Sequence, residues 1–152
     1  MRSLGAAAMS LATFLLVAAC GAVTVTPPAP TPADFQGIAT ELTNRGLELG
    51  RLTAGDAGCD DPTMIQTAIG FDASGVDQPD PVRLRIYIFR NRAAFERLRA
   101  SVDLCARSYV TDPETYETVE QSPYVVAGTG PWPPGFEAAI REALEVAAGT
   151  GT

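Results

Sequence analysis

Histidine and lysine are both absent from this chain of 152 residues, and these absences exclude several kinds of chemistry. Without histidine there is no Ser-His or Cys-His nucleophile pair and no imidazole metal ligand. Without lysine there is no amine to form a Schiff base. All eleven basic residues are therefore arginines, which stand against eighteen acidic residues and give a formal net charge of −7. A chain this acidic lacks the positive surface on which nucleic acids bind, so we exclude nucleic acid as a partner.

Long hydrophobic runs are also absent, except at the N-terminus. Arg2 precedes an apolar run over residues 4–19 that is rich in alanine and ends in small residues. This layout is typical of a secretory signal peptide. A membrane-spanning helix needs about 20 strongly apolar residues, and a buried N-terminal helix would show an amphipathic face, so both alternatives fit less well.

The apolar run ends at residues 17–20, which read VAAC. These residues resemble the lipobox of bacterial lipoproteins, in which an apolar residue and two small residues precede an obligatory cysteine. The resemblance implies that Cys20 receives a diacylglycerol thioether and becomes the N-terminus of the mature chain. Two or three acyl chains, at about 0.8 kcal/mol per buried CH₂, hold a protein more firmly than one. We therefore expect a lipid anchor on the extracytoplasmic face of a cell membrane, with inner or outer membrane left open.

The next segment, residues 21–32, carries four prolines and no charge. Proline-rich chains favour an extended form, so this segment is a tether that spans up to roughly 35 Å. The predicted organisation is a signal peptide (1–19), the lipidated cysteine with its tether (20–32), one domain (33–148) and a flexible tail (149–152).

Cysteine is scarce, with only three in the chain. Once Cys20 carries lipid, Cys59 and Cys105 remain as an even pair in an oxidising compartment, where two thiols usually form a disulfide. The alternative of a zinc site lacks ligands, because two thiolates without histidine do not complete one. We expect the disulfide, and neither a metal nor another cofactor.

Hydrophobic periodicity predicts an α+β domain. The clearest strand covers residues 82–90, in which Arg83 and Arg85 share one face and apolar residues share the other. Large side chains on both faces place this strand centrally in a sheet. Asn91 caps the helix that follows, with Cys105 on its buried stripe. Residues 64–71 fit a helix slightly better than a strand. The other predicted elements are helix 32–45, strand 47–53, strands 116–120 and 123–127, and a final helix over 136–147.

The predicted order of elements matches most of a split βαβ arrangement. We expect a small, antiparallel-rich sheet of three to four strands with helices packed on one face. The polar segment over residues 72–81 is dense in turn residues and is predicted to be a connection.

Three stretches carry candidate functional residues. The acidic loop with Asp56, Asp60 and Asp61 has oxygens for Ca²⁺, but its spacing fits no calcium loop, and a solvated turn that caps a helix fits better. Trp132 either packs under the last helix or offers an anchor to a partner. Its loop is not a phosphate cradle, because its prolines have no N–H to donate.

The third stretch is the charged face of the central strand. Arg83 and Arg85 point the same way as Tyr87 and together can bind a carboxylate, sulfate or phosphate. The alternative is a solvated face without a ligand.

These observations favour a membrane-anchored binding or interaction module without enzymatic activity. Its predicted partners are an envelope protein, an envelope polymer or a small anion, besides the membrane itself. Residues 87–98 and 122–132 are similar to uncharacterised small surface lipoproteins, a resemblance that implies no particular activity. The alternatives are a hydrolase or transferase that uses carboxylates alone, and an accessory subunit of an envelope complex.

Overall fold

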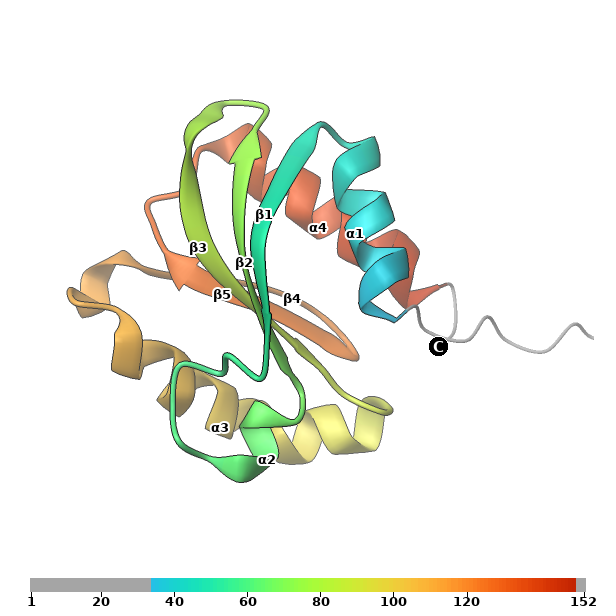
Figure 1. Ribbon diagram of the computed structural model, residues 1–152. Coiled ribbons are helices and arrows are strands. Elements are labelled where there is room, and N and C mark those ends of the chain that lie inside the picture. Colours follow the sequence, from blue (N-terminus) through green and yellow to red (C-terminus); the bar gives the residue numbers. More distant parts are fainter. Residues whose placement is uncertain (1–33, 150–152) are drawn as a thin grey trace, which may run out of the picture.

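A five-stranded antiparallel sheet forms the centre of the computed structural model, which describes residues 34–149 (Figure 1). The predicted signal peptide, the tether with Cys20 and nearly all of the predicted tail lie outside the described residues. The helices are α1 (Phe35–Asn44), α2 (Pro62–Ile65), α3 (Arg92–Tyr109) and α4 (Pro134–Ala148), with a 3₁₀ turn at Pro113–Thr115. The strands are β1 (Leu47–Ala54), β2 (Ala68–Gly75), β3 (Gln78–Ile88), β4 (Tyr116–Gln121) and β5 (Tyr124–Thr129).

The α+β class is confirmed, but the prediction of three to four strands is wrong, because the part of the chain that the structure describes forms five. Residues 64–71 divide between two elements: α2 ends at Ile65, and β2 begins at Ala68. The segment 72–81 is not a loop but the ends of β2 and β3, joined by a tight turn. Backbone pairing between the two strands outweighs the weak strand propensity of their turn-forming residues.

The strand order is β1-β2-β3-β5-β4. Since β5 is antiparallel to both β3 and β4, these two strands run parallel to each other, with β5 between them and α3 as their connection. The split βαβ unit expected from the order of elements is therefore present.

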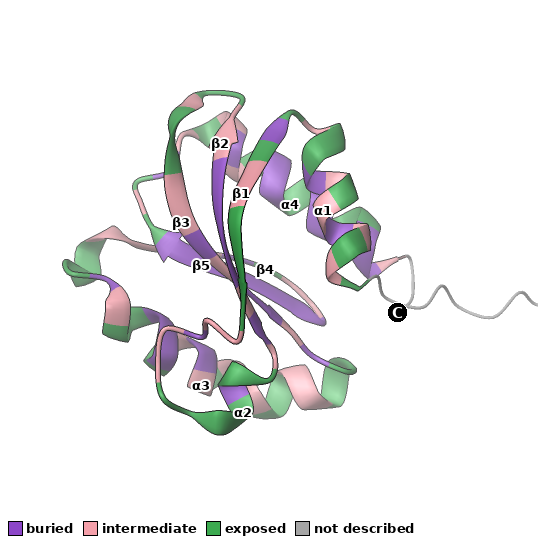
Figure 2. Cartoon of the chain, in the orientation of Figure 1, coloured by how far each residue is buried: buried purple, intermediate pink, exposed green. Residues whose placement is uncertain are grey.

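Helices cover both faces of the sheet, so the prediction of helices on one face is wrong (Figure 1). One core joins α1 and α4 to Leu84 and Ile86 of β3. The other joins α2 and α3 to the fully buried Tyr87 and to Phe89. Because β3 carries large apolar side chains on both sides, each side requires cover, and Figure 2 shows the buried residues of the sheet between the two helical layers.

The second core also contains the predicted disulfide. Cys59, in the connection between β1 and α2, is bonded to Cys105 of α3, with the Cα atoms 5.0 Å apart. The bond fastens the connection 55–61 to the helix. Asn91 caps α3 as predicted, its side chain accepting a hydrogen bond from the Ala94 N–H at 2.9 Å.

Candidate functional site

Arg83 and Arg85 bind the same carboxylate. Arg83 Nη2 lies 2.7 Å from Asp56 Oδ2, and Arg85 Nε lies 2.7 Å from Asp56 Oδ1. The arginines come from neighbouring outward positions of β3, whereas Asp56 comes from the connection 55–61. The two arginines are therefore brought together as predicted, but an internal carboxylate occupies them.

A second carboxylate, Asp72 of β2, stands directly opposite Arg83 in the sheet. Its Oδ1 lies 3.3 Å from Arg83 Nη1, and its Oδ2 accepts a hydrogen bond from Arg51 Nε at 2.5 Å. A register shift between Gly50 and Thr53 in β1 places Arg51 at φ +42°, from where its side chain reaches Asp72. We call Arg51, Asp56, Asp72, Arg83 and Arg85 the arginine–aspartate cluster.

Aromatic side chains hold one side of this cluster. The ring of Tyr109 in α3 lies over the Arg85 guanidinium, 3.6 Å from its centroid to Cζ. The Tyr87 hydroxyl, predicted to share in ligand binding, is instead buried and donates to the Ala57 carbonyl at 2.7 Å. Gly58 has φ +78°, and a Cβ there would lie 2.1 Å from Tyr109 Cδ1, so this position requires glycine.

Gly70 of β2 forms the floor beneath Asp56. A Cβ at Gly70 would lie 2.3 Å from Asp56 Oδ2 and 2.5 Å from Arg83 Nη2. The carboxylate can therefore lie flat on the sheet only because residue 70 has no side chain. We call the space bounded by Gly70, Arg83 and Arg85 the carboxylate seat.

The electrostatics of the cluster favour ionised carboxylates. Burial alone would raise the pKa of Asp56, but the hydrogen bonds from Arg83 and Arg85 outweigh it and lower the pKa. The hydrogen bond from Arg51 likewise lowers the pKa of Asp72. Both groups are fixed negative charges at neutral pH and hold no proton to donate.

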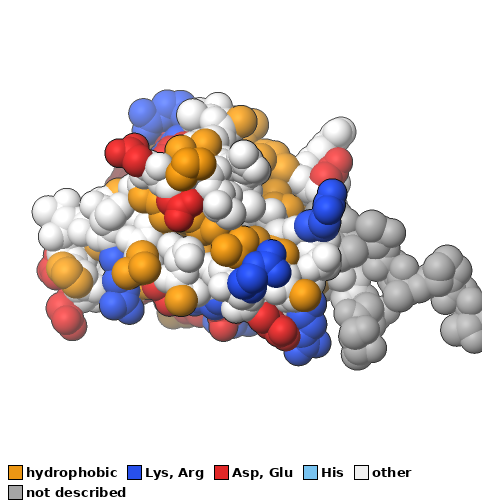
Figure 3. Space-filling model, turned by 90° about the horizontal axis from the view of Figure 1, so that it is seen from below, with side chains coloured by type: hydrophobic (Ala, Val, Ile, Leu, Met, Phe, Trp, Pro, Cys, Tyr) orange, Lys and Arg blue, Asp and Glu red, His pale blue; other side chains and the backbone are white. Residues whose placement is uncertain are grey.

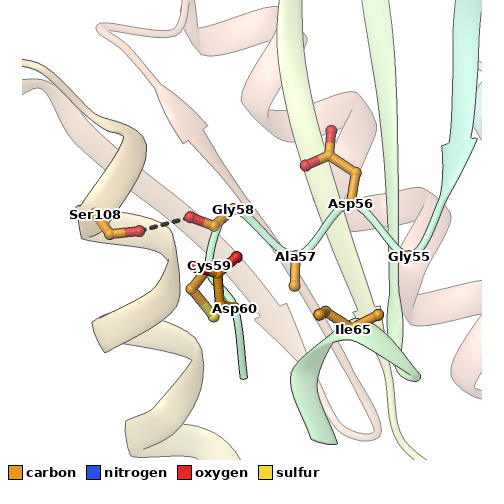
Figure 4. A pocket seen from close by; sticks show the side chains of 8 residues that line it. All are labelled: Gly55, Asp56, Ala57, Gly58, Cys59, Asp60, Ile65 and Ser108. Carbon is orange, nitrogen blue, oxygen red and sulfur yellow. Dashed lines mark hydrogen bonds between the residues drawn. The ribbon is translucent and has the colours of Figure 1, made fainter. Parts of the chain in front are cut away.

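An open pocket of about 570 Å³ lies beside the cluster (Figure 4). It is lined by residues of the connection 55–60, by Ile65 and by Ser108, whose hydroxyl donates to the Gly58 carbonyl at 2.6 Å. The Asp56 carboxylate points away from the side chains of Ala57 and Ile65 in this view. The pocket thus gives solvent access to the connection that supplies Asp56.

The three acids of the predicted acidic loop have different roles. Asp56 binds the arginines, and Asp61 caps α2 by accepting from the N–H groups of Thr63 at 2.8 Å and Met64 at 3.3 Å. Asp60 is exposed. The helix cap expected from the sequence is confirmed, and among residues 34–149 no three acidic or cysteine side chains form a cluster able to hold a metal ion.

Trp132 is not available as a partner anchor, because it is only 6% exposed. Its Nε1 donates to the Thr129 carbonyl at 3.0 Å, its backbone N–H donates to Glu117, and its ring packs edge-on against Phe136 of α4. The alternative expectation, packing under the last helix, is the one that the structure shows.

Asp56 and Asp72 were not expected as partners of the arginines. The pairing of Asp72 with Arg83 follows from the register of the β2–β3 hairpin, which a correct placement of the turn would have revealed. Asp56 is 27 residues from Arg83 and 29 from Arg85, and no local pattern connects them.

No single type of side chain dominates the surface on the α2–α3 side. Figure 3 shows hydrophobic side chains interspersed with acidic and basic ones. Within residues 34–149, no helix has the length and apolar character that crossing a membrane requires.

Comparisons with known proteins found no relative of this chain. No family model matches it, and neither a curated protein nor a solved structure does.

Proposed function

We propose that the protein is a lipid-anchored extracytoplasmic module that binds a ligand or partner and does not catalyse a reaction. The observation that carries the proposal is the disulfide between Cys59 and Cys105. Such bonds persist mainly in oxidising compartments, which supports export. The bond also leaves Cys20, in its lipobox-like sequence, as the one cysteine available for lipid among the three in the chain.

Binding is favoured over catalysis by the state of the carboxylates. Asp56 and Asp72 contact the same Arg83 guanidinium, so two acids do approach each other. Both have lowered pKa values, however, and a general acid requires a raised one. Fixed charges with defined hydrogen-bonding directions suit recognition instead.

Metabolic labelling with a tagged fatty acid tests the anchor. The wild-type chain incorporates the label, and Cys20→Ala does not. The double variant Cys59→Ser/Cys105→Ser is the matched control and incorporates as much label as the wild type. An unlabelled wild type, or equal labelling of Cys20→Ala, contradicts the proposal.

A further inference from the structure

We infer that the carboxylate seat is a binding site for the carboxylate of an external ligand, and that Asp56 fills this seat when the ligand is absent. The inference rests on the proposed binding function and names the chemistry that this function recognises. Asp56 is then an internal competitor, and the ligand displaces it.

The geometry of the seat is complete without Asp56. Arg83 and Arg85 present one N–H each, at 2.7 Å from two different oxygens of one carboxylate, which is the arrangement that a planar two-oxygen anion requires. Tyr109 stacks on Arg85, and Asp72 and the Arg51 carbonyl bind Arg83, so other groups keep both guanidiniums in place. Gly70 leaves room for the anion against the backbone of β2.

Asp56 can leave the carboxylate seat because of the chain segment that carries it. Asp56 lies between Gly55 and Gly58, both at φ +78°, where the backbone has the freedom of glycine. The side chains of Asp56 and Arg83 are 19% and 28% exposed, and Asp56 also lines the pocket of about 570 Å³. The disulfide holds Cys59 to α3, and the carbonyls of Ala57 and Gly58 accept hydrogen bonds from Tyr87 and Ser108. Displacement of Asp56 is therefore confined to its own side chain and the backbone next to Gly55.

The charge balance also favours an incoming anion. With Asp56 present, the cluster contains three arginines and two aspartates, and a variant that lacks this carboxylate raises the excess of positive charge from one to two. A tethered group competes at an effective concentration on the order of millimolar or more. A small carboxylate therefore binds the wild type weakly, and a full ligand needs further contacts along the pocket.

Removal of Asp56 tests the inference, with sodium acetate as the probe. We would titrate acetate into the full-length native protein in non-ionic detergent at constant ionic strength and follow thermal unfolding by the fluorescence of Trp132, the single tryptophan. Acetate is expected to stabilise Asp56→Ala saturably, with an apparent Kd at least tenfold lower than for the wild type. Asp56→Asn, which keeps the size of the side chain, shows a smaller gain in affinity for acetate.

Two further variants separate the seat from other effects. Asp60→Ala removes a charge from the same connection and responds to acetate as the wild type does. Asp56→Ala/Arg85→Gln loses the gain. Equal responses of Asp56→Ala and Asp56→Ala/Arg85→Gln would overturn the inference, as would a stronger gain from phosphate than from acetate. Because fatty-acid labelling does not depend on the seat, a failure here is distinguishable from a failure of the anchor.

Discussion

Single side chains in the cluster have opposing effects on stability. Burying part of Asp56 costs solvation energy, and two arginines at 2.7 Å offset this cost. The exposed Arg51 contributes less, since ion pairs in water are worth little even at short distance. The net effect of Asp56 and Asp72 on the stability of the fold depends on both carboxylates remaining ionised.

Acid should therefore destabilise the protein through these two groups. Their pKa values are lower in the folded chain than the ordinary 3.8, so their contribution is present above that value and is lost as the pH falls through the folded values. Urea unfolding between about pH 6 and about pH 2.5 should show a steep loss of stability in the wild type and a shallower one in Asp56→Asn/Asp72→Asn. Asp60→Asn, which contacts neither arginine, should keep the wild-type slope; a wild-type slope in the double variant would contradict the assignment.

The close packing above Gly70 can be tested by adding a single Cβ atom at this position. Gly70→Ala should lower the free energy of unfolding by about 1–3 kcal/mol, because the new Cβ displaces Asp56 and Arg83. Gly50→Ala is the matched control in β1, where a Cβ would meet Asp72 Cβ at an ordinary 4.0 Å. Urea unfolding of both variants measures the difference, and equal losses would show that the crowding at Gly70 relaxes without cost.

Among the helices and strands, the β2–β3 turn caps the start of α4. The helix begins after Pro133 with no capping side chain of its own. Asp77 in the turn accepts hydrogen bonds from the N–H groups of Gly135 at 2.9 Å and Phe136 at 2.7 Å. A residue 58 positions away in the chain thus performs the role of a local cap.

Loss of this distant cap should destabilise α4 and the core beneath it. Asp77→Ala is expected to lower the free energy of unfolding by about 1–2 kcal/mol, as for other helix caps. Asp80→Ala, on the same hairpin, should have an effect below about 0.5 kcal/mol. Denaturation followed by Trp132 fluorescence compares them, and a neutral Asp77→Ala would show that water replaces the carboxylate at no cost.

Elements with strong local signals were predictable from the sequence. The side chains of β3 alternate between the two faces of the sheet through Ile88, and α3 starts at its Asn91 cap, as expected. The segment 72–81 was mistaken for a loop because turn-forming residues such as Gly75, Pro79 and Pro81 lie within the strands on both sides of the two-residue turn. No local sequence pattern indicates that Asp77 caps α4.

Across the domain, the disulfide connects the candidate site to the second core. It joins the segment that carries Asp56 to α3, the helix that carries Tyr109. The sequence predicted the pair from the number of cysteines and from the expected signal peptide. It also predicted that Arg83 and Arg85 face one way, but not which carboxylate meets them, because the path of the connection 55–61 depends on the assembled fold.

Breaking this bond should weaken the whole domain. A crosslink that closes a 46-residue separation stabilises by about 4 kcal/mol in the chain-entropy model. The double variant Cys59→Ser/Cys105→Ser should lose about this much in urea unfolding, and a reductant should lower the wild type to the same level without affecting the variant. A loss below about 1 kcal/mol would show that the unfolded chain is already restricted without the bond.

Attachment of lipid to Cys20 can be measured from the intact mass of the protein purified from its own membranes. The expected product begins at Cys20, lacks residues 1–19, retains the Cys59–Cys105 bond and carries the added mass of a diacylglycerol. A product that still contains residues 1–19 and carries no lipid would contradict it.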